Sequence, residues 1–264
     1  MDETDDYTPA VTPVQAIDGG LWLKRDDLFS IAGVRGGKVR ACWTICTNAR
    51  DRGGLVGVTT ASHRPSPQGH IVAAVARRLG VPCRVHTPKG EYTDQMNFAV
   101  ACGAEIFQHK LGYNNVIIRR AADDALSLGP GWLHVPFGME SRVAVQSVAD
   151  EVRNLPVEAQ RLVVPVGSGI SLSGVLRGLR QWDIDLPVLG VMSGANSVER
   201  LDRHAPPNWR ARVTLVPSGV DYHTRVDATL GGVRLDPVYE AKCVKFLRPG
   251  DVLWCVGIRA GIPS

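Results

Sequence analysis

Short apolar runs alternate along this chain with segments in which apolar residues recur at helical spacing. Buried parallel strands are nearly continuous apolar runs, and the crossover helices that join them carry one apolar face. The predicted strands are Leu55 to Thr59, Cys83 to Thr87, Glu105 to Gln108, Trp132 to Val135, Arg161 to Val166, Val188 to Met192, Thr214 to Val216 and Val252 to Val256. This alternation predicts an α/β fold with mainly parallel sheets.

Helices are expected between several of these strands. Val39, Cys42, Trp43 and Cys46 fall at i, i+3, i+4 and i+7, which is the spacing of one buried helix face. Three further helices are expected, from Ile71 to Leu79, from a cap at Ser141 through Val148 towards Val152, and from Leu172 to Leu179. No long linker separates two halves, so two domains would have to be closely interleaved.

The composition is that of an ordinary globular protein. The 264 residues are 44% hydrophobic and 21% charged, which is enough for a well-buried core. No apolar run reaches the roughly 18 to 20 residues of a membrane span, and the acidic start at Asp2 and Glu3 is unlike a secretory signal. We therefore expect no membrane partner and a cytoplasmic location.

Charge and metal-binding residues exclude several classes of function. The net charge of +4 is not gathered into a basic block, so it gives little support for a polyanionic partner. The six cysteines form no C-x-x-C pair and the seven histidines no H-E-x-x-H motif. We expect no metal site, and buried thiols in the core.

A glycine-rich run follows the predicted strand from Arg161 to Val166 and leads into a predicted helix. It reads Gly167-Ser168-Gly169-Ile170-Ser171, and backbone N–H groups at such a turn can hold a phosphate. The P-loop lysine is absent, and Leu172 stands where a dinucleotide motif has its third glycine. A plain strand-to-helix turn and a nucleotide site are the alternatives.

Lys38 follows Gly36 and Gly37 and precedes the first predicted helix. A lysine amine can hold an aldehyde cofactor as an imine, although a lysine in this setting is most often solvated. Combined with a phosphate-binding turn, it indicates pyridoxal phosphate chemistry.

Motifs spread over the chain carry a family resemblance. They are Thr8-Pro9, Leu21 to Asp27, Gly36 to Arg40, Ser66-Pro67-Gln68, Val72 to Gly80, Gly103 to Glu105, Pro136 to Gly138, Gly167 to Gly169 and Leu235 to Lys242. In this order they resemble the pyridoxal phosphate enzymes of the tryptophan synthase β-subunit superfamily, fold type II. The nearest branch is that of aminocyclopropane-carboxylate deaminase and D-cysteine desulfhydrase.

The resemblance implies two interleaved three-layer α/β domains, a pyridoxal 5'-phosphate cofactor and a homodimer. It also implies roles for individual residues. Lys38 would form the Schiff base, and Ser66, Tyr239 and Tyr222 would join it as catalytic residues. The implied cofactor contacts are Lys38, Gln68, Gly167, Ser168, Gly169, Ile170, Ser171, Gly257 and Arg259.

The chain departs from the family at three of these places. Pro67 and Gly37 stand where relatives have asparagines. After the last strand no serine or threonine is available for the pyridine nitrogen, which leaves water or Arg259 to contact it. The stretch between Tyr222 and Leu235 is also shorter than in the deaminases.

We expect residues 1–40 and 149–264 to form a large cofactor domain and residues 41–148 a small inserted domain, with the cofactor between them. The predicted activity is that of a lyase, deaminase or decarboxylase acting on an amino acid or a similar amine. One alternative substrate is an amino-acid-modified pyrimidine in bacteriophage DNA, which would place the protein in the host cytoplasm. A second alternative is a protein that binds pyridoxal phosphate without catalysis.

Overall fold

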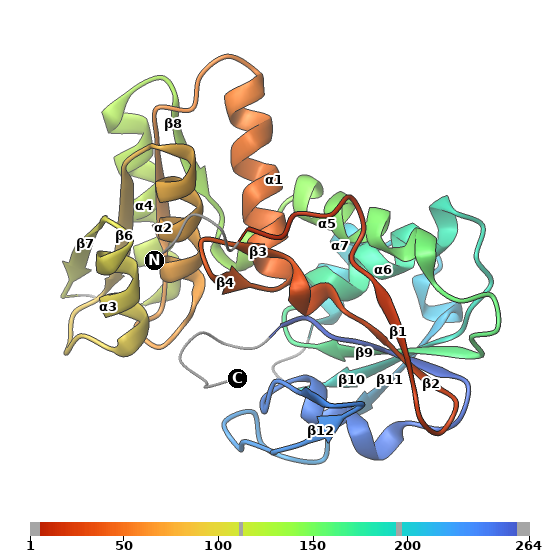
Figure 1. The fold of residues 1–264 in the computed structure, drawn as a ribbon. Helices are drawn as coiled ribbons and strands as arrows, with labels where there is room; N and C mark the ends of the chain where they lie inside the picture. The colour runs from red at the N-terminus through yellow and green to blue at the C-terminus, as the bar shows by residue number, and fades with distance from the viewer. Residues whose placement is uncertain (1–5, 111–112, 194–196, 258–264) are drawn as a thin grey trace. The chain divides into compact units, whose positions relative to one another are not determined.

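The computed structural model describes residues 6–110, 113–193 and 197–257, and it has the expected α/β architecture with mainly parallel sheets (Figure 1). Contacts between Cα atoms divide the chain into two compact units. Unit 1 contains residues 6–8 and 30–141, and unit 2 contains residues 9–29 and 142–257. Each unit is built around its own sheet.

Unit 1 has a four-stranded parallel sheet with the order β7-β6-β5-β8. Its strands are β5 (Gly57–Ala61), β6 (Cys83–Pro88), β7 (Ala104–His109) and β8 (Trp132–Val135). Its helices are α1 (Gly37–Asp51), α2 (Gln68–Leu79), α3 (Asp94–Ala101) and α4 (Asn114–Leu128). A short hairpin of β3 (Ser30–Ile31) and β4 (Val34–Arg35) precedes α1, and η3 (Phe137–Met139) follows β8.

The side chains of β5 alternate between two helical layers. Thr59 donates a hydrogen bond of 2.7 Å to the carbonyl of Ala121 in α4, and Ala61 packs against α4 as well. Thr60 points to the other face, where its hydroxyl accepts a hydrogen bond of 2.9 Å from Gln68 at the start of α2. Because every residue of β5 is buried, the strand is apolar or small on both faces.

Unit 2 has a six-stranded sheet with the order β1-β2-β14-β9-β10-β11, in which only β1 runs antiparallel to its neighbour. The strands are β1 (Val14–Ile17), β2 (Leu21–Lys24), β9 (Arg161–Val166), β10 (Val188–Met192), β11 (Val213–Pro217) and β14 (Asp251–Trp254), with a separate hairpin of β12 (Thr229–Leu230) and β13 (Val233–Arg234). The helices are α5 (Arg142–Ala149), α6 (Ile170–Gln181) and α7 (Val198–His204), with 3₁₀ turns η2 (Asp26–Leu28), η4 (Asp150–Asn154), η5 (Trp209–Ala211) and η6 (Glu240–Phe246).

Both faces of this sheet are covered. On one face α5 and α6 pack Val148, Val175 and Leu179 against strand residues such as Val164. On the other face Leu235 and the η6 segment pack against the sheet. Figure 1 shows α5, α6 and α7 on one side of the strands and the β12 segment on the other. The sheet is therefore the middle of three layers.

A buried ion pair fixes the N-terminal part of unit 2 to the segment after α5. Lys24 Nζ lies 2.7 Å from Glu151 Oε2, and both side chains are at most 1% exposed. Lys24 also donates to the Thr12 carbonyl and to Asn154 Oδ1, at 2.6 and 2.9 Å. Glu151 Oε2 accepts from the amide and the hydroxyl of Thr12. The hydrogen bonds offset the cost of removing both charges from water.

The units divide at different residues from those expected for the domains. Residues 30–40 lie in unit 1 because α1 continues to Asp51 and packs on α2. Residues 142–148 lie in unit 2 because α5 packs on α6. Lys38 therefore belongs to the unit that was expected to be only the inserted one.

None of the helices in the described ranges is long and apolar enough to cross a membrane.

Candidate functional site

The glycine-rich turn lies between β9 and α6, as the sequence predicts, and glycine is required at two of its positions. Gly169 has a φ of +92°, and a Cβ there would lie 3.0 Å from Ser197 Cβ. A Cβ on Gly167 would lie 2.8 Å from Tyr239 Cε1. The turn is therefore narrow on the side that faces Tyr239.

The first turn of α6 has hydrogen-bond donors to spare. No described side chain caps the helix, and its first N–H groups have no partner within it. Ser173 donates to the Gly169 carbonyl at 2.9 Å. Ser168 and Ser171 are half-buried, and neither hydroxyl bonds to another described residue. Free amides and two hydroxyls at a helix N-terminus fit a phosphate group.

The two predicted tyrosines lie together beside this turn. Their hydroxyl oxygens are 3.2 Å apart, and their rings meet edge to face. Asp236 Oδ1 accepts from the amides of Val238 and Tyr239, which fixes the turn that carries Tyr239. Lys242 is buried and donates to the Asp221 and Tyr222 carbonyls at 2.8 and 3.1 Å. Unit 2 therefore brings together Gly167, Tyr239 and Tyr222.

Glu240 is a functional candidate that the sequence analysis did not select. Its Oε1 accepts hydrogen bonds of 2.6 and 2.9 Å from the amides of Val256 and Gly257, directly after β14. Its Oε2 is buried and has no hydrogen-bond partner among the described residues. Burial raises the pKa of this carboxyl well above its usual range, and the neighbouring Asp236 carboxylate raises that pKa further. A protonated Oε2 would be a donor at the strand end where relatives present a hydroxyl.

We expect Glu240→Gln to remove part of the pH dependence of stability. In the unfolded chain this carboxyl loses its proton near 4.5, whereas in the folded protein it keeps the proton to higher pH. Its contribution to stability is therefore complete below that pH and is lost as the pH rises through the raised pKa. The free energy of unfolding from urea titrations should fall over this range in the wild type and less in the variant. Exposed Glu158→Gln is the control, and parallel curves for the wild type and Glu240→Gln would contradict this assignment.

Lys38 is the second residue of α1 and its side chain is exposed. The helix begins after Gly36, which has a φ of +113° and whose carbonyl accepts the first helical hydrogen bonds, from Val39 and Arg40. A positive φ favours glycine, which accounts for Gly36 at the residue before the helix. Its role in holding the cofactor stays a prediction.

Ser66 lies on the loop between β5 and α2, and Gln68 is the first residue of α2. Ser66 Oγ accepts a hydrogen bond of 3.3 Å from the Gln68 amide. The Gln68 side chain donates to Thr60 and to the Pro136 carbonyl, and accepts from the Gly138 amide at 2.6 Å. These bonds give Gln68 a role in positioning the 136–138 turn, and its predicted cofactor contact is untested.

Two of the remaining candidates lie among the described residues. Ile170 is the first residue of α6 and is buried, and the amide of Gly257 donates to Glu240. Arg259 lies outside the described residues, so the idea that it contacts the pyridine nitrogen is not tested.

The cysteines are buried and free, as predicted for core thiols. Burial raises the pKa of the Cys83, Cys243 and Cys255 thiols, which keeps them protonated. Within the described ranges no group of three or more histidine, cysteine or acidic residues is arranged to hold a metal ion.

Comparison with known proteins identifies the family of the chain. A family model described as "Pyridoxal-phosphate dependent enzyme" matches residues 7–230. The chain belongs to this family. The predictions of an enzyme that uses pyridoxal 5'-phosphate and has fold type II are confirmed, and the nucleotide-binding alternative is set aside.

Individual relatives agree with this assignment. An L-threonine dehydratase of Mycobacterium leprae is 30% identical over 69% of this chain, and the chain spans 44% of the length of that relative. A protein of Pyrococcus horikoshii named as a 1-aminocyclopropane-1-carboxylate deaminase is 22% identical and covers 92% of the chain and 86% of its own length. The crystal structure of an aminocyclopropane-carboxylate deaminase homologue superposes with a TM-score of 0.79 at 22% identity, over 94% of this chain and 90% of the other. At this identity the superposition shows a shared fold.

Proposed function

We propose that this chain is a lyase of the deaminase type that acts on a small amino acid. The observation that carries the proposal is the narrow turn of unit 2, whose spare amides and two serine hydroxyls suit the phosphate of the family's cofactor. The named relatives that support the reaction class are a threonine dehydratase and a protein named as an aminocyclopropane-carboxylate deaminase.

When bound, pyridoxal phosphate withdraws electrons from the α-carbon of an amino acid. Lys38 would hold the aldehyde end of the cofactor and then move a proton at the α-carbon as general base and acid. The turn from Gly167 to Ser171 would bind the phosphate, and Ser66 would assist proton transfer or contact the substrate carboxylate.

Tyr239 and Tyr222 would act as a pair in this proposal. Their hydroxyl oxygens are 3.2 Å apart, and either hydroxyl can donate to the other. A hydrogen bond between neighbouring hydroxyls polarises both, so the pair would be suited to proton exchange with the substrate. The buried Lys242 would keep Tyr222 in place through its carbonyl.

Glu240 would contact the pyridine nitrogen in place of the missing hydroxyl residue. Its carboxyl is anchored by two amides at the end of β14, and its second oxygen has no other described partner. A protonated carboxyl would donate a hydrogen bond to this nitrogen, orient the ring and keep the nitrogen unprotonated.

The test is a search for ammonia release by the purified protein after it has been saturated with pyridoxal phosphate. Both enantiomers of serine, threonine and cysteine, together with 1-aminocyclopropane-1-carboxylate, form the panel. We expect a visible cofactor band and, for at least one amine, equal amounts of ammonia and 2-oxo acid. A visible band without product from any amine would instead favour the non-catalytic alternative.

A further inference from the structure

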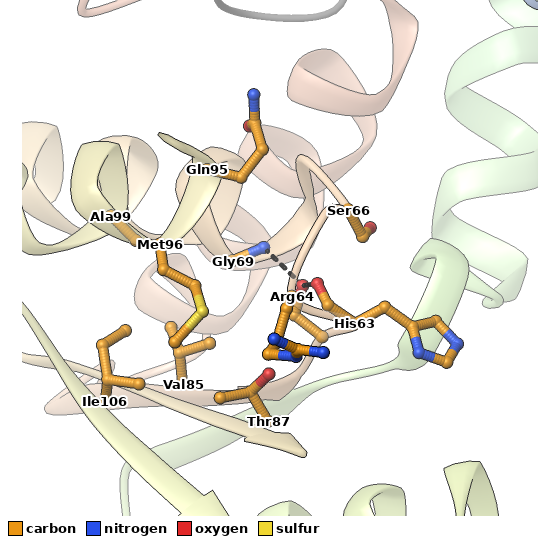
Figure 2. Close-up of a pocket in the computed structure, with 11 residues that line it drawn as sticks. His63, Arg64, Ser66, Gly69, Val85, Thr87, Gln95, Met96, Ala99 and Ile106 are labelled. Carbon is orange, nitrogen blue, oxygen red and sulfur yellow. Dashed lines mark hydrogen bonds between the residues drawn. The ribbon is translucent and has the colours of Figure 1, made fainter. Parts of the chain in front are cut away.

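Unit 1 contains a small cavity at the N-terminal end of α2, bounded by α3 and β6 (Figure 2). Its volume is about 10 Å³, which is the space of one water molecule or one oxygen atom of a larger group. Arg64, Ser66 and Thr87 are among the residues that line it. The cavity and its lining lie entirely within one unit.

The cavity lining carries both donors and acceptors, among them the hydroxyls of Ser66 and Thr87 and the side-chain amide of Gln95. Thr87 is 0% exposed, and its Oγ1 has no hydrogen-bond partner among the described residues. Ser66 Oγ accepts from the Gln68 amide, which leaves its own proton free to point elsewhere. The N-terminus of α2 adds partial positive charge. A buried hydroxyl without a partner is costly, so the cavity is suited to an acceptor atom.

Arg64 supplies a full positive charge at the same place. The guanidinium donates to the Glu91 carbonyl at 3.3 Å, and no described carboxylate lies within ion-pair distance of it. The side chain is half-buried, so most of its donors are neither paired nor fully hydrated.

The backbone around Arg64 holds the guanidinium in this position. Thr93 Oγ1 donates to the Arg64 carbonyl at 2.5 Å, which ties the loop to the start of α3. The guanidinium lies directly over Gly90, where a Cβ would collide with it. Any side chain at position 90 would therefore displace the charged group without removing it.

We propose that Arg64, together with Thr87, binds a second anionic group carried on the side chain of the substrate. The inference rests on the proposed function and narrows its substrate class to amino acids with a side-chain carboxylate or phosphate. One oxygen of that group occupies the cavity and accepts from Thr87, while the charge is neutralised by Arg64. A carboxylate or phosphate matches the planar fork of the guanidinium, and a neutral side chain leaves that charge unpaired.

The experiment compares kcat/KM of the cofactor-saturated enzyme for serine and threonine with that for 3-hydroxyaspartate and O-phosphoserine, in both enantiomers, because each of these amino acids has a leaving group on the β-carbon. Arg64→Gln is expected to lower kcat/KM for the anionic amino acids about 10- to 100-fold and to change it for the neutral ones less than about threefold. Gly90→Ala should act in the same direction because it moves the guanidinium. Lys89→Gln is the matched control, because it removes an exposed cation next to Gly90 in the sequence. It should change kcat/KM neither for the anionic nor for the neutral amino acids. The ratio of kcat/KM between 3-hydroxyaspartate and O-phosphoserine decides whether the anionic group is a carboxylate or a phosphate.

A second measurement is independent of turnover. Calorimetric titration with succinate and with inorganic phosphate should show binding to the wild type and to Lys89→Gln that is weakened about tenfold or more in Arg64→Gln. If both the wild type and Arg64→Gln turned over neutral and anionic amino acids equally well, the inference would be overturned. The proposed function would remain intact. Absence of any turnover with Arg64-dependent binding retained would overturn the proposed function alone. Calorimetric binding that is the same in Arg64→Gln, or absent, would show that the cavity holds only water and would overturn the inference.

Discussion

Replacement of Lys38 by alanine is expected to abolish covalent attachment of the cofactor and to lower kcat about a thousandfold or more. The amine of Lys38 is the group that the proposal assigns both to the cofactor aldehyde and to proton transfer at the α-carbon. Loss of one side chain therefore removes two functions that act in sequence. The fold should survive, because the Lys38 side chain is exposed at the first turn of α1.

The measurement is the intact mass after borohydride reduction of the cofactor-saturated protein, followed by peptide mapping. The wild type should gain one reduced cofactor on the peptide that contains Lys38, and Lys38→Ala should gain none. Lys110→Ala, which removes an exposed lysine in the same unit, should be labelled like the wild type. Label on another lysine of the wild-type protein would contradict the assignment of Lys38.

Breaking the buried pair of Lys24 and Glu151 should have the largest effect on stability. Glu151→Ala leaves the Lys24 ammonium, which is 0% exposed, without its carboxylate, and it removes the acceptor of two Thr12 hydrogen bonds. Loss of one member of a buried pair costs about 3 to 5 kcal/mol in the free energy of unfolding. Urea or guanidinium unfolding followed by circular dichroism measures this difference.

Two comparisons separate loss of the charge pair from loss of packing. The double variant Lys24→Met with Glu151→Leu removes both charges and should be markedly more stable than Glu151→Ala. Asp123→Ala breaks an exposed pair with Arg119 and should cost less than about 1 kcal/mol. If Glu151→Ala were no more destabilising than Asp123→Ala, the pair would not hold the N-terminal segment in the way described.

Three strands with mainly apolar sequences were predictable to the residue. The bounds expected for β8, β9 and β10 agree with the structure, because parallel strands are apolar over most of their length. The expected helix around Ser141 to Asn154 is divided into α5 and a 3₁₀ segment, η4. Periodicity does not distinguish these two helix types near a helix end.

Several elements escaped the sequence analysis because they have little apolar periodicity. Helix α3 buries only Met96 and Ala99, and α4 buries Ile117, Ala121 and Ala125 among many polar residues. Strands β1 and β2 are only four residues long, which is too short for a clear alternation of apolar and polar residues.

The site residues also include some that the sequence reveals and one whose role only the fold reveals. The glycines at 167 and 169 are visible in the sequence because the backbone geometry requires them. Glu240 stands in the motif from Leu235 to Lys242 that carried the resemblance, but the motif alone does not show which atoms the carboxyl contacts. That role depends on amides at Val256 and Gly257, which only folding brings to it. The available signal was that Glu240 follows Tyr239 in this motif, in a chain that has no serine or threonine directly after its last strand.

The sequence alone determined the alternation of strands and helices, the phosphate-type turn and the family, because these depend on local pattern and on backbone conformations that particular residues require. Only the tertiary structure decided which polar side chains are buried together, as for Glu240 with the end of β14 and Lys24 with Glu151. Burial changes the cost of a charge or of an unpaired hydroxyl, and burial is a property of residues distant in the chain that pack side by side.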